Sequence, residues 1–585
     1  MSRAVWLDAA ELRIGLGCMR LSTDYDRDEE RALETIAAAA EAGITVFDTA
    51  HSYAPGAADL GHNERLLAHG LRRSGMEARA RIVSKGGMAR SGDGWVPDGR
   101  AKAILGDCDA SLAALGGLAI DVYLIHAPDP RTPWRTSVRA LARLVDEGLV
   151  RRVGVSNVNR RQLDEALELA PVGAVEVALS PFDDRALRGG VVERCVEIGI
   201  PVIAHSPLGG PRRAGRVPRE PALVEVAHAR GATPAEVALA WLLELSPAVV
   251  PIPGARRPET ARSAARAAAV QLEAADRKVL RAAFGAPRPA RAAPRPAKRG
   301  GEVVLVMGIP GAGKTRVAHD YVARGYLRLN RDERAGTLRD LAGALEERLA
   351  EGARRVVLDN TYLTRASRSY VVETAGRHGV AARCIWLDTP LAQAQINLVE
   401  RMLQRLGSVP EPDELRALAR REQGILLPTS QMRTLRELEP PDEDEGFTGV
   451  ERVAFARTPL PGRTGAGVIV AAAALRRPGW EGAREPPARD APHLVFHWEP
   501  GATRDALVAD VARLECVITG AVESALCPHP AGPPTCWCRP PLPGLPLAFA
   551  RAHEVDLARS LLVGAGAAHR TLAAALGTRY VEVGA

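Results

Sequence analysis

The chain has 585 residues, a net charge of +7 and 46% hydrophobic residues. It is long enough for several domains, because one hydrophobic core rarely serves more than about 250–300 residues. The absence of any window of about 20 apolar residues argues against a transmembrane helix. Because the first residues also lack an apolar signal core, we expect a cytoplasmic protein without a membrane partner. The positive net charge is compatible with a polyanionic binding partner.

Arginine supplies nearly all of the positive charge, since only five lysines occur among the 77 basic residues. Lysine presents a compact ammonium whose pKa can be shifted, whereas arginine presents a wide, permanently charged fork. A lysine that is retained in such a chain can mark a position that needs an ammonium. Two of the five, Lys85 and Lys314, lie in the strongest motifs of the sequence.

Residues 1–285 alternate short apolar segments with longer helical ones, which predicts parallel strands and a closed (β/α)8 barrel. The strand candidates are residues 44–50, 81–87, 121–128, 151–157, 174–181, 201–208 and 248–254. Several of these segments end in polar residues, among them Asp48, Lys85 and His126, and Tyr53 follows Asp48 by five positions. Barrel enzymes place their active sites at such strand ends, although any one short strand can simply end in a polar loop.

This part of the chain resembles the aldo-keto reductases through "GITVFDTAHSY", "SKGG", "DVYLIHAPDP", "GLVRRVGVSN" and "VVPIPGARRPE". The resemblance implies a catalytic tetrad of Asp48, Tyr53, Lys85 and His126 that reduces an aldehyde or ketone. A phenol with a pKa near 10 is a poor acid at neutral pH. An ammonium at Lys85, held by Asp48, would lower the cost of the phenolate, and His126 would orient the carbonyl.

The same resemblance implies the residues that bind the nicotinamide cofactor. Nicotinamide and pyrophosphate would lie against Ser156, Asn157, Ser206, Pro207, Leu208 and Gly209. Glu176 stands where the family has a glutamine, so it can accept a hydrogen bond from the nicotinamide amide. Arg256 and Arg257 could pair with a 2′-phosphate, which favours NADPH, or form a solvated basic turn.

A Pro, Ala and Arg-rich segment at 286–300 predicts an extended linker, and a second α/β domain follows at 301–447. It opens with "GIPGAGKT", which places Gly308, Gly311, Gly313, Lys314 and Thr315 between a strand and a helix. Such a loop wraps phosphates with backbone N–H groups, while the lysine reaches the β/γ oxygens of ATP and the threonine binds Mg²⁺.

With "DNT" at 359–361, this domain resembles the polynucleotide 5′-kinases. The resemblance implies that Asp332 accepts the proton of a nucleic acid 5′-hydroxyl and that Arg401 and Arg405, on a lid helix, face the transferring phosphoryl group. Alternative interpretations are a helix N-cap for Asp332, a solvated arginine face for the lid, and a small metabolite as the acceptor.

Four potential soft ligands, Cys527, His529, Cys536 and Cys538, lie within twelve residues of a third region, 448–585. In a reduced compartment, a Cys-x-His and Cys-x-Cys arrangement predicts a closed tetrahedral Zn²⁺ site with a structural role.

The third region resembles zinc-containing haloacid-dehalogenase-type phosphatases, which have a small α/β domain. Their catalytic positions are missing from this chain. Ala456 and Arg457 stand where the first strand, placed at 452–462, should end in aspartates, and Pro540 and Ala565 replace a lysine and an aspartate. The resemblance therefore implies a degenerate phosphatase domain without activity.

The sequence thus predicts a bifunctional enzyme, an NADPH-dependent carbonyl reductase joined to an ATP-dependent kinase, and we hypothesise a role in nucleic acid repair. A non-catalytic scaffold that binds NADP and ATP is the alternative from another functional class.

Overall fold

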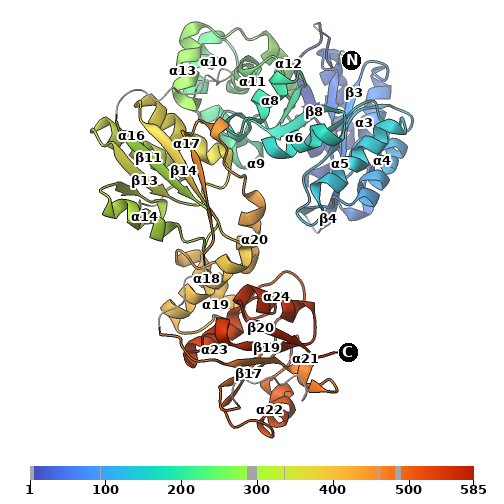
Figure 1. Ribbon diagram of the computed structural model, residues 1–585. Coiled ribbons are helices and arrows are strands. Elements are labelled where there is room, and N and C mark those ends of the chain that lie inside the picture. Colours follow the sequence, from blue (N-terminus) through green and yellow to red (C-terminus); the bar gives the residue numbers. More distant parts are fainter. Residues whose placement is uncertain are drawn as a thin grey trace. The chain divides into compact units, whose positions relative to one another are not determined.

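The computed structural model describes residues 6–8, 10–91, 94–285, 300–334, 336–456, 462–480 and 489–584, without the side chain of Arg212. They belong to two compact units, Met1–Ala292 and Ala293–Ala585 (Figure 1). Apart from Gly300, the predicted linker lies outside the described residues. Within these ranges, no helix is both long enough and apolar enough to cross a membrane.

The first unit contains eight parallel strands in the order β1-β2-β3-β6-β7-β8-β9-β10 (Figure 1). They are Gly15–Gly17, Val46–Asp48, Arg81–Gly86, Ile120–Ile125, Val153–Ser156, Val172–Ala178, Val202–His205 and Val249–Pro251. A hydrogen bond of 3.0 Å from Gly17 N to Pro253 O and a parallel bridge between Gly17 and Gly254 close the ring. The predicted (β/α)8 barrel is therefore confirmed, and its parallel strands direct their carboxyl ends to one mouth.

Strand β1 was absent from the predicted strands because its sequence, Gly-Leu-Gly, has a low intrinsic preference for strands. Packing explains its glycines. A Cβ at Gly15 would lie 2.9 Å from side-chain atoms of Ile252 and Val46, and one at Gly17 would lie 2.9 Å from the Ile252 carbonyl oxygen. The closing strand therefore needs residues without side chains at both ends.

Helices surround the barrel, and several of them, such as α5 (Trp134–Asp146), are amphipathic. The main ones are α2 Glu29–Glu41, α3 His62–Arg73, α4 Ala101–Leu115, α5 Trp134–Asp146, α6 Arg160–Leu169, α8 Val191–Glu197, α10 Pro221–Arg230, α11 Pro234–Leu245, α12 Pro258–Arg266 and α13 Ala274–Phe284. In α5, Val138, Leu141 and Leu144 are buried at helical spacing. Small and β-branched side chains such as Val83, Val122 and Ile203 belong to a separate buried cluster of strand residues.

The second unit begins with a parallel sheet in the order β12-β13-β11-β14-β15. Its strands are Leu327–Leu329, Arg355–Asp359, Glu302–Met307, Ala381–Asp388 and Val450–Ala454. Its helices are α14 Lys314–Ala323, α15 Arg331–Arg334, α16 Leu338–Ala350, α17 Arg365–Arg377, α18 Leu391–Leu406, α19 Pro412–Arg421 and α20 Pro428–Glu437. The nucleotide-binding motif thus follows the central strand, β11.

A second five-stranded parallel sheet follows, in the order β18-β17-β16-β19-β20. Its strands are Val522–Cys527, His493–Trp498, Val468–Ala471, Leu561–Gly564 and Arg579–Glu582, and its main helices are α22 Val508–Glu515, α23 Gly544–Ala552 and α24 Ala567–Leu576. We call the region that carries this sheet the C-terminal domain.

The structure corrects the strand that the sequence assigned to the start of this domain. Residues 452–454 belong to β15, which pairs with β14 and extends the first sheet beyond residue 447; Arg457 lies outside the described residues. The central strand of the C-terminal sheet is instead β16, and the residues that follow it are Ala472, Ala473 and Ala474. The carboxyl end of the true central strand therefore also lacks an aspartate.

Helix α18 contributes to two buried clusters, and through Ala394 it packs with Val306 and Ile385 of the P-loop sheet. Leu398, Met402 and Leu403 of this helix cluster with Phe496 and Leu547 of the C-terminal domain. A hydrogen bond of 2.8 Å from Gln393 Nε2 to Ala575 O adds a polar contact. Helix α18 therefore belongs to the packing of both sheets.

Candidate active sites

Three members of the predicted tetrad meet in the mouth of the barrel. Lys85, fully buried at the end of β3, donates a hydrogen bond to Asp48 at the end of β2 and another, of 3.1 Å, to Thr49 O. Its Nζ lies 5.2 Å from the centre of the Tyr53 ring. Parallel strands bring these residues together, as the sequence predicted from their strand-end positions.

His126, which follows β6, completes this group. Its ring packs edge-on against Tyr53, with the ring centres 5.4 Å apart. Burial, followed by the charge of Lys85, holds the pKa of His126 well below its ordinary value. The imidazole is therefore neutral at pH 7 and can donate a hydrogen bond from one nitrogen.

Burial keeps Tyr53 in the phenol form. Burial raises the pKa of Tyr53 above its ordinary value, and the Lys85 ammonium acts in the opposite direction. For Lys85, burial acts to lower the pKa, but Asp48 and Glu176 outweigh burial, so the pKa of Lys85 is raised. Tyr53 is thus a proton donor beside a fixed ammonium, and the effect of burial was not part of the sequence argument.

Glu176, on β8, is a second carboxyl group beside Lys85. Its Oε2 lies 3.3 Å from Lys85 Nζ and has no hydrogen-bond partner among the described residues. Burial and the neighbouring Asp48 raise the pKa of Glu176 well above its ordinary value. A protonated Glu176 can donate a hydrogen bond as well as accept one, so it resembles a glutamine more closely than the sequence suggested.

Ser156 and Asn157, at the end of β7, lie beside this group. Asn157 Nδ2 donates to His126 O and Ser156 Oγ, each at 3.0 Å, and Asn157 Oδ1 lies 2.9 Å from His205 Nε2. Asn157 and Ser206 adopt positive φ angles of 57° and 52°. Such angles are unusual for residues with side chains and often occur at ligand sites.

Arg256 and Arg257 differ in their surroundings. Arg256 pairs with Asp24 at 3.1 Å and with Asp26 at 2.6 Å, whereas Arg257 is exposed at the start of α12. A phosphate at Arg256 would therefore share that guanidinium with two carboxylates.

Trp95 is a candidate residue that the sequence analysis missed. It lies on β5 (Gly94–Pro97), which pairs with β4 (Met88–Ser91) as an antiparallel hairpin after β3. Its indole donates a hydrogen bond of 3.2 Å to the carbonyl of Ser52, next to Tyr53. A partly exposed tryptophan beside the tetrad can form a wall for a bound carbonyl compound, but nothing in its local sequence marks it.

In the second unit, the P-loop joins β11 to α14 as predicted. Lys314 Nζ donates to the carbonyls of Gly308 at 2.9 Å and Ile309 at 3.0 Å. Gly311 has φ 86°, and a Cβ there would lie 2.3 Å from Ala394 O of helix α18, so only glycine fits. Burial lowers the pKa of Lys314 to about 8.

The charged groups that act on Lys314 define the rest of this site. Asp359 and Asp332 raise the pKa of Lys314 and Arg401 lowers it, although burial outweighs all three. Asp359 ends β13 and forms two hydrogen bonds, of 2.8 and 2.9 Å, with Arg328. Asp332 is exposed on α15, where its backbone N–H donates to Asn330 Oδ1. Asp359 was quoted in the sequence only as part of "DNT" and was not assigned a site role.

The lid arginines are not equivalent. Arg405 pairs with Glu422 at 2.7 Å and donates to Gln423 O at 2.9 Å, whereas Arg401 lies near Lys314 and lines a cavity. The buried Arg368 of the segment after "DNT" pairs with Glu445 and has a structural role. Thr315, on the first turn of α14, is exposed.

Two regions of the chain match known families. Residues 13–283 match the aldo/keto reductase family and residues 303–423 match the AAA domain family. The probable aldo-keto reductase 1 of Glycine max is 31% identical over 296 residues, which cover 45% of this chain and 83% of that protein. The chain belongs to the aldo/keto reductase family. Its reductase domain is the barrel, and the relatives align with less than half of the chain.

The reductase domain has further relatives. The uncharacterized oxidoreductase C215.11c of Schizosaccharomyces pombe is 30% identical over 267 residues, 44% of this chain and 82% of that protein. A crystal structure of the thermostable aldo-keto reductase Tm1743 with the inhibitor epalrestat shows 33% identity. It covers 46% of this chain and 94% of that one, with a TM-score of 0.40.

The C-terminal domain brings the four predicted metal ligands together. One ligand atom from each of Cys527, His529, Cys536 and Cys538 lies within 4.8 Å of the others. The sulfur atom of Cys527 lies 3.7 Å from that of Cys536 and 3.3 Å from that of Cys538. Two sulfur ligands of a tetrahedral zinc site with Zn–S bonds of about 2.3 Å lie about 3.8 Å apart, which is close to these distances. The donor set therefore fits Zn²⁺.

The second nitrogen of His529 has a partner of its own. Its Nε2 lies 2.8 Å from Glu411 Oε2, at the start of helix α19. Carboxylates in this position fix the orientation of metal-binding histidines. Trp537 Nε1 also donates to Leu426 O at 2.9 Å, after the end of α19. The segment of the cluster therefore contacts the chain on both sides of α19.

Proposed function

We propose that the barrel reduces an aldehyde or ketone with NADPH. The supporting observation is the convergence of Tyr53, Lys85 and Asp48 at its mouth. NADPH would supply the hydride, and Ser156, Asn157 and residues 206–209 would hold it beside the unpartnered Glu176 Oε2. Tyr53 donates its hydroxyl proton to the carbonyl oxygen, Lys85 stabilises the phenolate, and neutral His126 orients the carbonyl. Arg256 and Arg257 would favour NADPH over NADH.

The test is NADPH oxidation with a panel of aldehydes and ketones. Tyr53→Phe removes the proton donor and should lower kcat by about 10²–10⁴-fold while NADPH still binds. Absence of nucleotide binding by the wild type would reject the reductase proposal. Equal affinities for NADPH and NADH would remove the role given to the two arginines.

We also propose that the P-loop domain transfers the γ-phosphoryl group of ATP to a nucleic acid 5′-hydroxyl. The supporting observation is the P-loop after β11, which holds Lys314 against its carbonyls, with Asp359 at the end of the neighbouring strand β13. Asp332 would accept the hydroxyl proton, and Lys314 and Arg401 would stabilise the transferring charge. Thr315 and Asp359 offer the oxygen atoms that would hold Mg²⁺. The exposed Asp332 lies between Arg331 and Arg334 on α15, which suits a polyanionic acceptor.

The decisive experiment supplies labelled ATP and Mg²⁺ with 5′-hydroxyl oligonucleotides in one reaction and with sugars and nucleosides in another. Label on the oligonucleotide alone supports the proposed acceptor. Label on the small hydroxyl compounds alone would retain the kinase and reject the nucleic acid.

For the C-terminal domain, we propose one structural Zn²⁺ per chain and no phosphatase activity. Four protein ligands leave no open position on the metal, and the chain has alanines after β16 and Ala565 after β19 where a phosphatase needs carboxylates. Metal analysis of protein purified without chelators should find one zinc. Mg²⁺-dependent release of phosphate by Lys314→Ala protein would contradict the proposed inactivity.

A further inference from the structure

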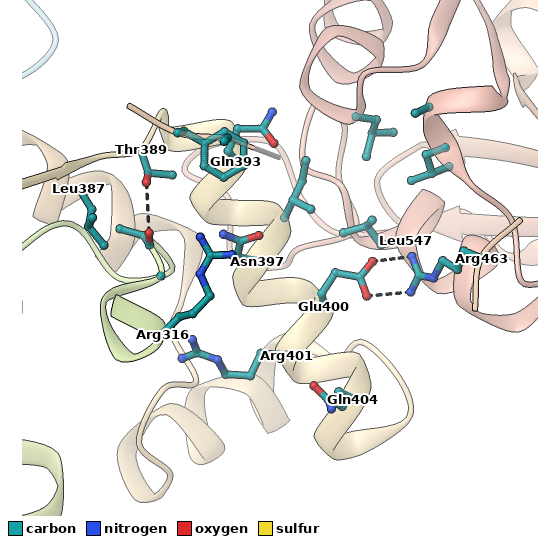
Figure 2. A pocket seen from close by; sticks show the side chains of 18 of the residues that line it. Arg316, Leu387, Thr389, Gln393, Asn397, Glu400, Arg401, Gln404, Arg463 and Leu547 are labelled. Carbon is teal, nitrogen blue, oxygen red and sulfur yellow. Dashed lines mark hydrogen bonds and ion pairs between the residues drawn. The ribbon is translucent and has the colours of Figure 1, made fainter. Parts of the chain in front are cut away.

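A cavity of about 570 Å³ lies beside the P-loop (Figure 2). Its walls include Ala312 and Gly313 of the loop, Asn397 of lid helix α18, and Leu547 and Ala558 of the C-terminal domain. Pockets for small ligands typically have volumes of about 300–1,000 Å³. The cavity is therefore large enough for a nucleoside and has walls from both parts of the second unit.

The order of the strands shows which side of the P-loop the cavity occupies. The loop follows β11, at the centre of the sheet, and the acceptor-side residues Asp359 and Asp332 follow β13 and β12 on one side. The cavity is lined by Leu387 of β14 and by Val453 of β15, on the other side. A nucleotide with phosphates in the loop would thus extend away from the acceptor and into the cavity.

We propose that this cavity binds the nucleoside of the phosphoryl donor and that the C-terminal domain supplies one of its walls. The inference rests on the proposed kinase function. Val317, Ile396 and Leu547 provide apolar surface for a planar base. Arg316 and Arg401 lie near each other on the loop side, where they can meet the phosphates (Figure 2), and the amide of Asn397 can donate to and accept from polar atoms of the nucleoside.

An ion pair holds this wall against the lid. Glu400 of α18 and Arg463 of the C-terminal domain form two hydrogen bonds of 2.7 and 2.8 Å, with side-chain exposures of 13% and 11% (Figure 2). A pair so deeply buried is costly to break, because the remaining charge would have no partner. The C-terminal wall is therefore fixed relative to the helix that carries Arg401.

This arrangement assigns a task to a domain that lacks the carboxylates of a phosphatase. Because its side chains line the donor pocket, the domain would be required for ATP affinity rather than for a second reaction. The P-loop would still bind inorganic polyphosphate, whose contacts do not extend into the cavity. Comparison of the affinities for ATP and for inorganic polyphosphate therefore distinguishes binding to the C-terminal wall of the cavity from binding to the P-loop.

The test measures the affinity of the full chain for ATP and for inorganic tripolyphosphate by calorimetry. Ala558→Trp places a large side chain in the cavity from an exposed position of its wall, and Ala552→Trp is the matched control at an exposed position outside the lining residues. We expect Ala558→Trp to weaken ATP binding by about 10- to 100-fold and to change tripolyphosphate binding less than twofold. The control should change neither.

An unchanged affinity of the Ala558→Trp variant for ATP would overturn the inference while leaving the kinase proposal in place. Failure of the wild type to bind either ligand would reject the kinase proposal, and the inference with it. Photolabelling with 8-azido-ATP gives an independent measurement. Label on the tryptic peptide 552–559 supports the C-terminal wall, and label confined to peptides before residue 457 contradicts it.

Discussion

The barrel mouth contains a buried lysine and the P-loop a half-buried one, and the charges of the two are balanced in opposite ways. Lys85 lies between the carboxyl groups of Asp48 and Glu176, and the charge of Asp48 above all keeps it an ammonium despite its burial. Lys314 binds two neutral carbonyls, and burial lowers its pKa to about 8. The reductase site is therefore complete before any ligand arrives, whereas the P-loop lysine obtains its counter-charge from the phosphates that it binds.

The largest expected effect comes from removing Lys85, the lysine whose charge is balanced by a carboxylate of the protein itself. Lys85→Met leaves the Asp48 carboxylate, beside the Glu176 carboxyl group, buried without a cation. This change should destabilise the barrel by about 3–5 kcal/mol and abolish carbonyl reduction. Guanidinium unfolding of the full chain measures the first effect. The exposed Lys102 provides the control, since Lys102→Met should shift stability by less than about 0.5 kcal/mol. Equal stability of the two variants would show that Lys85 is not balanced by these carboxyl groups.

Removing Lys314, whose charge would be balanced by bound phosphates, should lower activity without lowering the stability of the fold. In Lys314→Ala, phosphoryl transfer should fall by about 10²–10³-fold or more. The unfolding midpoint should stay the same or rise, because a half-buried ammonium that contacts only neutral carbonyls is gone. Transfer assays and thermal unfolding measure the two quantities, with the exposed Arg339→Ala as the control. A large loss of stability would remove the distinction between the two lysines.

The pH dependence of ATP binding sharpens the comparison further. With a pKa of about 8 in the free protein, Lys314 loses its proton as pH rises above 8. Bound phosphate raises that pKa, so binding takes up a proton and affinity falls with pH, by up to about tenfold per unit. Calorimetry in two buffers of different ionisation enthalpy measures the proton uptake. Lys314→Ala should show none, and uptake in that variant would assign the proton to another group.

The smallest expected effect concerns Glu176. Because its pKa is raised by burial and by Asp48, the folded protein keeps a proton that the unfolded chain loses above its ordinary pKa of about 4.3. Stability therefore falls as pH rises from that value towards the raised pKa. Glu176→Gln removes this pH-dependent loss of stability. Between pH 5 and pH 8, the melting temperature of the variant should therefore fall by about 2–4 °C less than that of the wild type. An identical fall in both proteins would contradict a protonated Glu176.

The sequence was most informative about side chains whose chemistry is specific and whose position is set by the ends of strands or by a glycine-rich loop. Lys85, Asp48, Tyr53 and Lys314 were predicted because strand ends and a glycine-rich loop place them by local rules. The cluster of Cys527, His529, Cys536 and Cys538 was predicted for the same reason, since the spacing of these residues is short.

The sequence was least informative where contacts join distant segments. The pairing of β15 with the P-loop sheet, the contact between Glu411 and His529, and the ion pair of Glu400 with Arg463 depend on packing between residues that are 60 or more positions apart. Burial was also invisible in the sequence, so the shifts in the pKa values of Tyr53, Lys314 and Glu176 could not be predicted from it.

The most direct measurement of the central claim, that the chain contains two independent active sites, assays both reactions in three proteins. Wild type, Tyr53→Phe and Lys314→Ala would each be given NADPH with an aldehyde panel and labelled ATP with a 5′-hydroxyl oligonucleotide. We expect wild type to perform both reactions, Tyr53→Phe to lose only reduction, and Lys314→Ala to lose only phosphoryl transfer. Loss of both reactions in either variant, or neither reaction in the wild type, would contradict the account.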